Sequence, residues 1–432
     1  MWQRCEPLLS SIIQRARSTY KHELLLGNLA GIPIAQQHGS ADDNVPVYHA
    51  RLMHTILDQI QWPSSYNELP GKGHWFEGVM TTSFLTSFYY AMVDRTKPRF
   101  EGTTTSPSRA DDPEIMSMGP FTITVPASGN LGSMAGIQVD QLVSPDMNGK
   151  LRVHRDPKTH TWHIRTHNIF RFHLTKASPR VDLPATMVLD QLEEPFSVNP
   201  AQLDRTWYVK LADGSWDASH DAQWKTLGQR YGHQLGAADA ILRTRGTFAI
   251  SMCSPGVDEV AVQISRNLMQ YYAADSRIHE DCLNWLTEHH PGNVFTLAVG
   301  EDLPRSKLGN FPIHTHRGGL VVFGNRPSSG LPGSKYEYAY EPGLGAVFLR
   351  PLENERLEMV IWGADLAGLQ QAARLTPTLT GSGQPEYVIL SDRCRWEGVG
   401  GVYSAGHLDR SWQISSASYH SVDAVWGSRV PS

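Results

Sequence analysis

The chain has 432 residues, which is too long for one ordinary hydrophobic core, and we therefore expect two or three domains. Hydrophobic residues make up 40% of the chain and charged residues 19%, which is the composition of a soluble globular protein. The net charge of −5 at pH 7 shows no excess of basic residues that would favour binding to nucleic acid or to an anionic membrane, and we expect neither partner.

The four cysteines, Cys5, Cys253, Cys282 and Cys394, show no Cys-x-x-Cys spacing. We therefore expect core thiols rather than a zinc site or a disulfide framework. No run of residues reaches the roughly 18 apolar positions that a membrane span requires. The N-terminus lacks the apolar core and the cleavage site of a signal peptide and instead predicts an amphipathic helix, which leaves the localisation open.

The first ninety residues predict alternating strands and helices. Apolar residues at helical spacing predict a helix over residues 7–24, and a short apolar run predicts a buried strand over 32–36. After a loop at 42–44, residues 45–62 predict an amphipathic helix that ends before Pro63. A strand over 66–69, a turn over 70–73 and a helix around 84–92 follow.

Asp42 and His74 occupy the loops after the two predicted strands, where ligands bind in an open parallel sheet. The order strand, Asp loop, helix, strand, His loop, helix is that of the last part of an α/β-hydrolase. In such a site His74 would take the proton of a serine hydroxyl, and Asp42 would fix the tautomer of His74. The plainer alternative is that Asp43 or Asn44 caps the helix and His74 only packs. His38 could line the same pocket, but we favour a structural role.

Two sequence motifs carry a family resemblance. Residues 38–47 read His-Gly-Ser-Ala-Asp-Asp-Asn-Val-Pro-Val, and residues 70–75 read Pro-Gly-Lys-Gly-His-Trp. This stretch resembles the catalytic domain of prolyl-oligopeptidase-family serine peptidases, including their dipeptidyl-peptidase branch, and the chain resembles large fungal prolyl-oligopeptidase-like proteins. The resemblance implies that Asp42 is the triad acid and His74 the base. It covers only residues 1–94.

The nucleophile is missing from this arrangement. A hydrolase elbow reads Gly-x-Ser-x-Gly on a strand-to-helix turn, and the chain contains no match. The nearest sequence surrounds Ser133, but it follows His74 and lies in a β-rich region, so we do not expect Ser133 to act. Either the chain is the C-terminal part of a longer peptidase, which we favour, or it is a short protein that cannot use this mechanism.

Beyond residue 94 the pattern changes twice. Residues 95–118 predict a linker, and residues 119–212 alternate in a way that predicts a small β-sandwich or barrel. The histidines of this region are expected to face solvent rather than bind a metal; they are His154, His160, His163, His167 and His173.

Residues 213–432 predict a further α/β domain. Its His314-Thr-His316 motif has metal-ligand spacing but lacks the acidic residue expected a few positions on, and we expect no metal there. Trp207, Trp216 and Trp224 could form a sugar-binding platform, although core packing is favoured.

The predicted fold is therefore the C-terminal part of an α/β-hydrolase sheet over 1–94, a linker over 95–118, a β-sandwich-like domain over 119–212 and an α/β domain over 213–432. The predicted function is that of a serine-type peptidase or hydrolase acting on peptide or ester bonds, with Asp42 and His74 as two triad members and no cofactor or metal. The alternative is a non-catalytic binding or assembly protein. The exposed edge of a half-sheet could also pair two copies of the chain.

Overall fold

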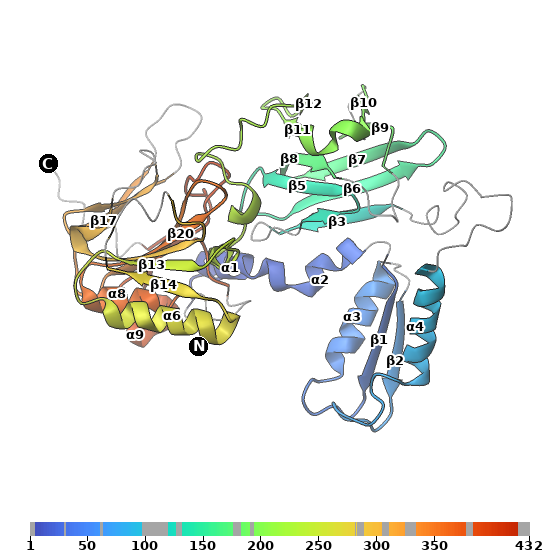
Figure 1. Ribbon diagram of the computed structural model, residues 1–432, viewed down its shortest axis with the longest axis horizontal. Helices are drawn as coiled ribbons and strands as arrows, with labels where there is room; N and C mark the ends of the chain where they lie inside the picture. Colours follow the sequence, from blue (N-terminus) through green and yellow to red (C-terminus); the bar gives the residue numbers. More distant parts are fainter. Residues whose placement is uncertain are drawn as a thin grey trace.

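A computed structural model describes residues 5–29, 32–60, 64–96, 120–126, 132–175, 183–190, 194–280, 282, 289–304, 311–324, 334–376 and 383–421. Within these residues the fold is mixed α/β, with many strands in several sheets and few helices. Figure 1 shows a small unit with α3 and α4, a two-sheet part and a larger mixed sheet. Most of the predicted linker lies outside the described residues.

The N-terminal residues form several short helices instead of the single helix predicted over 7–24. These are α1 (Pro7–Ala16), η2 (Ser18–Tyr20), α2 (His22–Leu25) and η3 (Leu26–Leu29). Leu9 of α1 belongs to the core of the mixed sheet, and the Asn28 side chain bonds both backbone groups of Thr124 in the two-sheet part, at 2.7 and 2.8 Å. Residues 5–29 therefore contact the later parts of the chain, although we placed them with the hydrolase-like segment.

The small unit consists of β1 (Ile34–Gly39), α3 (Tyr48–Gln59), β2 (Ser64–Leu69) and α4 (Ser83–Thr96). The two strands are parallel, from Ile34 opposite Ser64 to Gly39 opposite Leu69. The predicted order of strands and helices is confirmed, with boundaries shifted by a few residues. The prediction that the first strand is buried is wrong, since β1 is only half-buried along most of its length in a two-stranded sheet. A bidentate ion pair from Arg51 to Glu68, at 2.5 and 2.9 Å, ties α3 to β2.

This unit has almost no core of its own. Leu57 is the one fully buried apolar side chain described between residues 32 and 94. Large apolar side chains are instead exposed on both helices and in the loops, among them Tyr48, Leu52, Trp75, Met80, Tyr90 and Val93. Parallel sheets are normally covered on both faces, and two strands alone are marginal at best. The unit has the burial expected of part of a larger sheet.

The next part consists of two five-stranded sheets that face each other across one shared core. The first sheet, in spatial order, contains β10 (Phe196–Ser197), β9 (Thr186–Leu189), β7 (Thr161–His167), β6 (Gly149–Asp156) and β3 (Phe121–Val125). The second contains β12 (Trp216–Ser219), β11 (Trp207–Lys210), β8 (Ile169–Leu174), β5 (Ile137–Leu142) and β4 (Ser133–Met134). The short 3-10 helix η5 (Pro200–Arg205) precedes β11.

The alternating sequence explains this arrangement. Along β6, Leu151 and Val153 are buried while Arg152 and His154 are exposed, so one face of the sheet packs and the other meets solvent. Because β12 pairs with β11, the second sheet continues to Ser219, beyond the predicted boundary at residue 212.

The largest sheet has eight strands in the order β14-β13-β15-β20-β19-β21-β22-β23. Its first four strands are parallel, and the rest are antiparallel. The strands are β13 (Phe248–Met252), β14 (Ser276–His279), β15 (Val294–Val299), β19 (Gly345–Pro351), β20 (Leu357–Gly363), β21 (Tyr387–Leu390), β22 (Val402–Gly406) and β23 (Tyr419–His420).

Helices and a small sheet accompany these strands. The helices are α6 (Asp258–Tyr272), α8 (Leu366–Ala373) and α9 (Cys394–Glu397), and the single-turn helices are η6 (Gly232–Gln234), η7 (Ala238–Leu242), η8 (Gly300–Asp302) and η9 (Gly398–Gly401). The small sheet contains β16 (Ile313–His316), β17 (Gly319–Phe323) and β18 (Lys335–Tyr338). In the described part of the chain, no helix has the length and apolar character needed to span a membrane.

The expectation that all four cysteines are free thiols is wrong for one pair. Cys253 and Cys282 form a disulfide, with their Cα atoms 4.5 Å apart. The two residues are 29 positions apart in the sequence, and the fold brings Cys282 beside the segment that follows β13. Their spacing matches no short motif, so the pair could not be read from the sequence. Cys5 and Cys394 are free.

The disulfide predicts how many cysteine thiols can react. We expect the denatured, unreduced protein to react with two equivalents of a thiol reagent, because only Cys5 and Cys394 carry thiols. After reduction, all four cysteines should react. A count of four before reduction would contradict the Cys253–Cys282 bond.

Candidate active site

The parallel pairing of β1 and β2 brings the two candidate residues to one edge of the sheet. Gly39 and Leu69, the last residues of the strands, lie opposite each other. Asp42 follows the first strand by three positions, and His74 follows the second by five. Residues after the carboxyl ends of neighbouring parallel strands share the same edge, so the two loops meet there.

Backbone hydrogen bonds hold the two loops together. The Ser40 amide donates to the Leu69 carbonyl and the Ala41 amide donates to the Lys72 carbonyl, both at 2.9 Å. The hydroxyl of Ser40 accepts a bond from the Gly71 amide at 2.8 Å. Gly39 allows this approach, since a Cβ atom at that position would lie 2.3 Å from the Lys72 oxygen.

The carboxylate of Asp42 and the ring of His74 form a hydrogen bond of 2.9 Å between Oδ2 and Nδ1. A carboxylate only accepts, so Nδ1 of His74 carries a proton, and Nε2 is the nitrogen left to accept one from a reacting group. The Asp42 side chain is 4% exposed, whereas that of His74 is 29% exposed. The acid is therefore enclosed, and the base is open to a reacting group.

The other oxygen of Asp42 is held by the backbone. Oδ1 accepts hydrogen bonds from the amides of Asn44 and Val45, both at 2.9 Å. The Val45 amide, together with the bond to His74 and the Asn44 amide, lowers the pKa of Asp42 to about 2. The alternative in which Asp43 or Asn44 caps the helix is wrong, because α3 begins at Tyr48 after Val47, which makes no side-chain cap.

His38 lies against the Asp42 carboxylate. Its Nε2 donates to the Val45 carbonyl at 2.9 Å and lies 3.3 Å from Oδ2 of Asp42. The Asp42 carboxylate thus has two histidine neighbours, His74 and the ring of His38, which is itself held by the Val45 carbonyl. The structural role favoured for His38 consists of positioning the loop that carries Asp42.

No nucleophile stands beside this pair in the part of the chain that the structure describes. The only hydrogen-bond partner of the His74 ring there is Asp42. Trp75 lies edge-on to the ring at 4.8 Å and is 78% exposed. Ser133 belongs to β4 in the two-sheet part, where its hydroxyl is bonded to the hydroxyl of Thr175 at 2.7 Å.

Other histidine pairs are present but differ in their surroundings. His173 is bonded to Asp140 at 2.7 Å, and His407 is bonded to Glu386, but all four residues are buried. Ser404 lies 3.1 Å from Nδ1 of His420, yet Ser404 is fully buried, and its hydroxyl donates to the Tyr419 carbonyl.

Burial lowers the pKa of His420 to about 4, which makes that ring a weak base. Of these pairs, only Asp42–His74 combines an enclosed acid with an accessible imidazole.

The described residues contain no group of three His, Cys, Asp or Glu side chains arranged to hold a metal ion. His154, His163 and His167 are exposed on the outer face of β6 and β7, as expected. The expectation is wrong for His173, which is buried on β8 because its ring is bonded to Asp140 on the neighbouring β5. Trp207 and Trp216 are buried, and Trp224 packs edge-on against Trp207, so these rings serve packing.

No family model matches the chain. The chain is 41% identical over 423 residues to a protein of Arthroderma benhamiae that is named an uncharacterized secreted protein. The similarity covers 97% of this chain and 43% of that relative, so the chain spans less than half of the relative's length. The relative's name states no activity.

The lowered pKa of Asp42 gives a test of the site by pH. In the folded chain this carboxyl should stay ionised down to about pH 2, whereas a free aspartate titrates near 3.9. Its contribution to stability should therefore be complete above about pH 4 and should disappear as the pH falls towards 2. Carbon-13 NMR of labelled aspartate carboxyls, with the signal assigned by Asp42→Asn, measures the midpoint. A midpoint near 4 would contradict the bonds described for Asp42.

Proposed function

We propose that this chain carries the acid and the base of a serine-type hydrolase of the prolyl-oligopeptidase kind, acting on peptide or ester bonds. Asp42 is the orienting acid and His74 is the base. The serine belongs to sequence outside this chain, on its N-terminal side. The observation that supports the proposal most is the 2.9 Å bond between an enclosed Asp42 carboxylate and an accessible His74 ring at the carboxyl edge of two parallel strands.

The chemistry follows from the protonation state of the His74 ring. Nε2 would accept the proton of a serine hydroxyl as that oxygen attacks a carbonyl carbon, and would return the proton to the leaving group. The Asp42 carboxylate, which stays ionised at neutral pH, stabilises the imidazolium that forms in between. The hydrogen bonds to Asn44 and Val45 keep the carboxylate aimed at Nδ1.

The burial of the unit supports a larger hydrolase sheet. A two-stranded parallel sheet with exposed Tyr48, Leu52 and Tyr90 on its helices has the surfaces that further strands and helices would cover. The relative from Arthroderma benhamiae is more than twice as long as the aligned region, so similar chains have room for those elements and for a nucleophile. We propose that the missing strands and the serine elbow come from such sequence.

We further propose that the enzyme acts outside the cell. The Cys253–Cys282 disulfide is typical of proteins that mature in an oxidising compartment. The name of the relative describes that protein as secreted.

Labelling with a fluorophosphonate probe tests the function. We expect no labelling of the 432-residue chain and clear labelling of the same protein extended on its N-terminal side. In the extended protein, Asp42→Asn should lower the labelling rate by about 10⁴-fold, because the ring of His74 loses its tautomer, and His74→Ala should lower the rate by at least about 10³-fold. His49→Ala, an exposed histidine on α3, is the matched control and should label normally.

Two results would contradict the proposal. Labelling of the short chain would mean that it contains a nucleophile of its own. Labelling of the extended protein that survives His74→Ala would remove His74 from the mechanism. If neither protein labels while both are folded, the alternative of a non-catalytic binding or assembly protein is the better account.

A further inference from the structure

The outer face of the first sheet of the two-sheet part carries an unusual run of basic side chains. The register of β6 and β7 places Lys150 opposite His167, Arg152 opposite Arg165, and His154 opposite His163. All six side chains are exposed. We call these six residues the basic ladder. Since alternate residues of a strand share one face, its three rungs follow one another at spacings of about 7 Å.

Along these three rungs, every outward-facing residue of β6 and β7 is therefore basic. Like charges placed directly opposite each other on neighbouring strands destabilise a sheet. In the described part of the chain, neither Arg152 nor Arg165 forms an ion pair with a carboxylate. A bound anion would offset this repulsion.

The acidic residues nearest to the ladder are already engaged. Asp190 lines the same face, but its carboxylate accepts bonds from Thr166, from Trp216 at 2.9 Å and from the ammonium of Lys210 at 3.0 Å. Asp156, at the end of β6, accepts bonds from the Lys158 amide and the Thr159 hydroxyl, both at 2.9 Å. The charge of Asp190 is balanced by Lys210, whereas Asp156 keeps its charge but forms no ion pair with a ladder residue in the described part of the chain.

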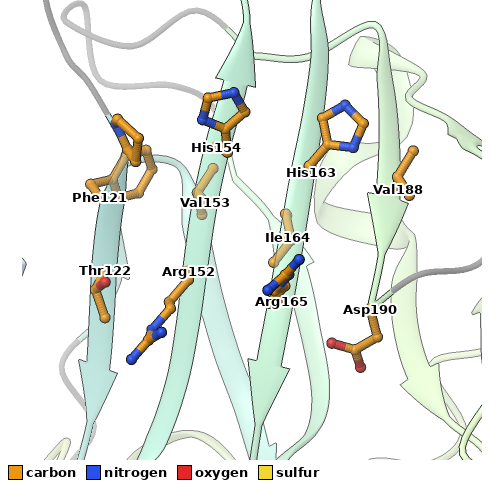
Figure 2. Close-up of a pocket in the computed structure, with 11 residues that line it drawn as sticks. Phe121, Thr122, Arg152, Val153, His154, His163, Ile164, Arg165, Val188 and Asp190 are labelled. Carbon is orange, nitrogen blue, oxygen red and sulfur yellow. The ribbon is translucent and has the colours of Figure 1, made fainter.

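Two of the rungs line an open hollow of about 540 Å³. Figure 2 shows Arg152 and Arg165 side by side on their strands, with the rings of His154 and His163 in the next rung and Val188 beside them. The two imidazole centroids are 6.4 Å apart. Paired guanidinium groups suit carboxylate and sulfate oxygens, to which each can donate two hydrogen bonds.

The surroundings favour a carbohydrate over other polyanions. None of the exposed Phe, Tyr or Trp side chains in the described residues belongs to β3, β6, β7 or β9, so this face lacks the large rings on which single-stranded nucleic acid usually stacks. Strands β6 and β7 are paired on both sides, so the face offers no free backbone groups to an acidic peptide. A sugar chain needs neither feature, because its acidic groups and hydroxyls can be bound by side-chain donors alone.

We propose that the basic ladder binds the carboxylate or sulfate groups of an acidic polysaccharide. The repeat of charge along such a polymer matches a site with three successive basic rungs. This site is separate from Asp42 and His74 and does not depend on the hydrolase proposal.

The test uses the intact chain and two immobilised polymers, dextran sulfate and polygalacturonate, with neutral dextran as the blank. The double variant Arg152→Gln and Arg165→Gln should bind the better of the two acidic polymers at least about tenfold more weakly, since it loses several charge-assisted hydrogen bonds. The matched control is Arg266→Gln with Arg277→Gln, which removes the same charge from exposed positions on α6 and β14 and should bind like the wild type. Thermal unfolding should show the ladder variant to be at least as stable as the wild type, because the opposed charges are gone.

Failure of the wild-type chain to bind either acidic polymer would overturn the proposal. So would an equal loss of binding in the control variant, since the effect would then be one of net charge. Tighter binding of single-stranded DNA, abolished by the same ladder substitutions, would identify a nucleic-acid site instead. Stronger binding of dextran sulfate than of polygalacturonate would assign the ladder to sulfate groups, and the reverse would assign it to carboxylates.

Discussion

The parallel pairing of β1 with β2 is the interaction on which the candidate active site depends. It sets Gly39 opposite Leu69, and the loops that leave these residues are then joined by backbone hydrogen bonds. Gly39 has no side chain to keep the Lys72 carbonyl away, so the loops can come close enough for Asp42 to reach His74. A slip of one residue in this register would turn the strand faces over and separate the acid from the base.

The same unit shows what the described chain does not provide. Its sheet has two strands, its helices expose apolar side chains, and no serine approaches the His74 ring among the described residues. Folding this unit costs conformational entropy, and the burial of Leu57 alone offsets little of that cost. The proposed hydrolase accounts for both observations, because further strands would cover the exposed faces and would carry a serine to His74.

The sequence predicted local structure better than it predicted contacts. Residues 32–94 could be divided correctly into strands and helices because periodicity, Pro63 and the Pro-Gly turn act locally. The partners of residues 5–29 could not be predicted, since Leu9 packs in the core of the mixed sheet, whose strands lie more than 200 residues further along the sequence. The Cys253–Cys282 disulfide could not be predicted either, because a separation of 29 residues matches no short cysteine motif. The histidines of β6 and β7 were correctly expected to face solvent, but only the strand register shows that Arg152 meets Arg165 and that a basic ladder results on a chain of net negative charge.

The most direct measurement for the central claim is a structure of the N-terminally extended protein after reaction with a fluorophosphonate. Our account predicts a phosphonylated serine whose Oγ lies about 3 Å from Nε2 of His74, on an elbow between additional strands of the β1–β2 sheet. An adduct elsewhere in the protein, or a His74 Nε2 that faces solvent or packed side chains with no serine beside it, would contradict the assignment of Asp42 and His74.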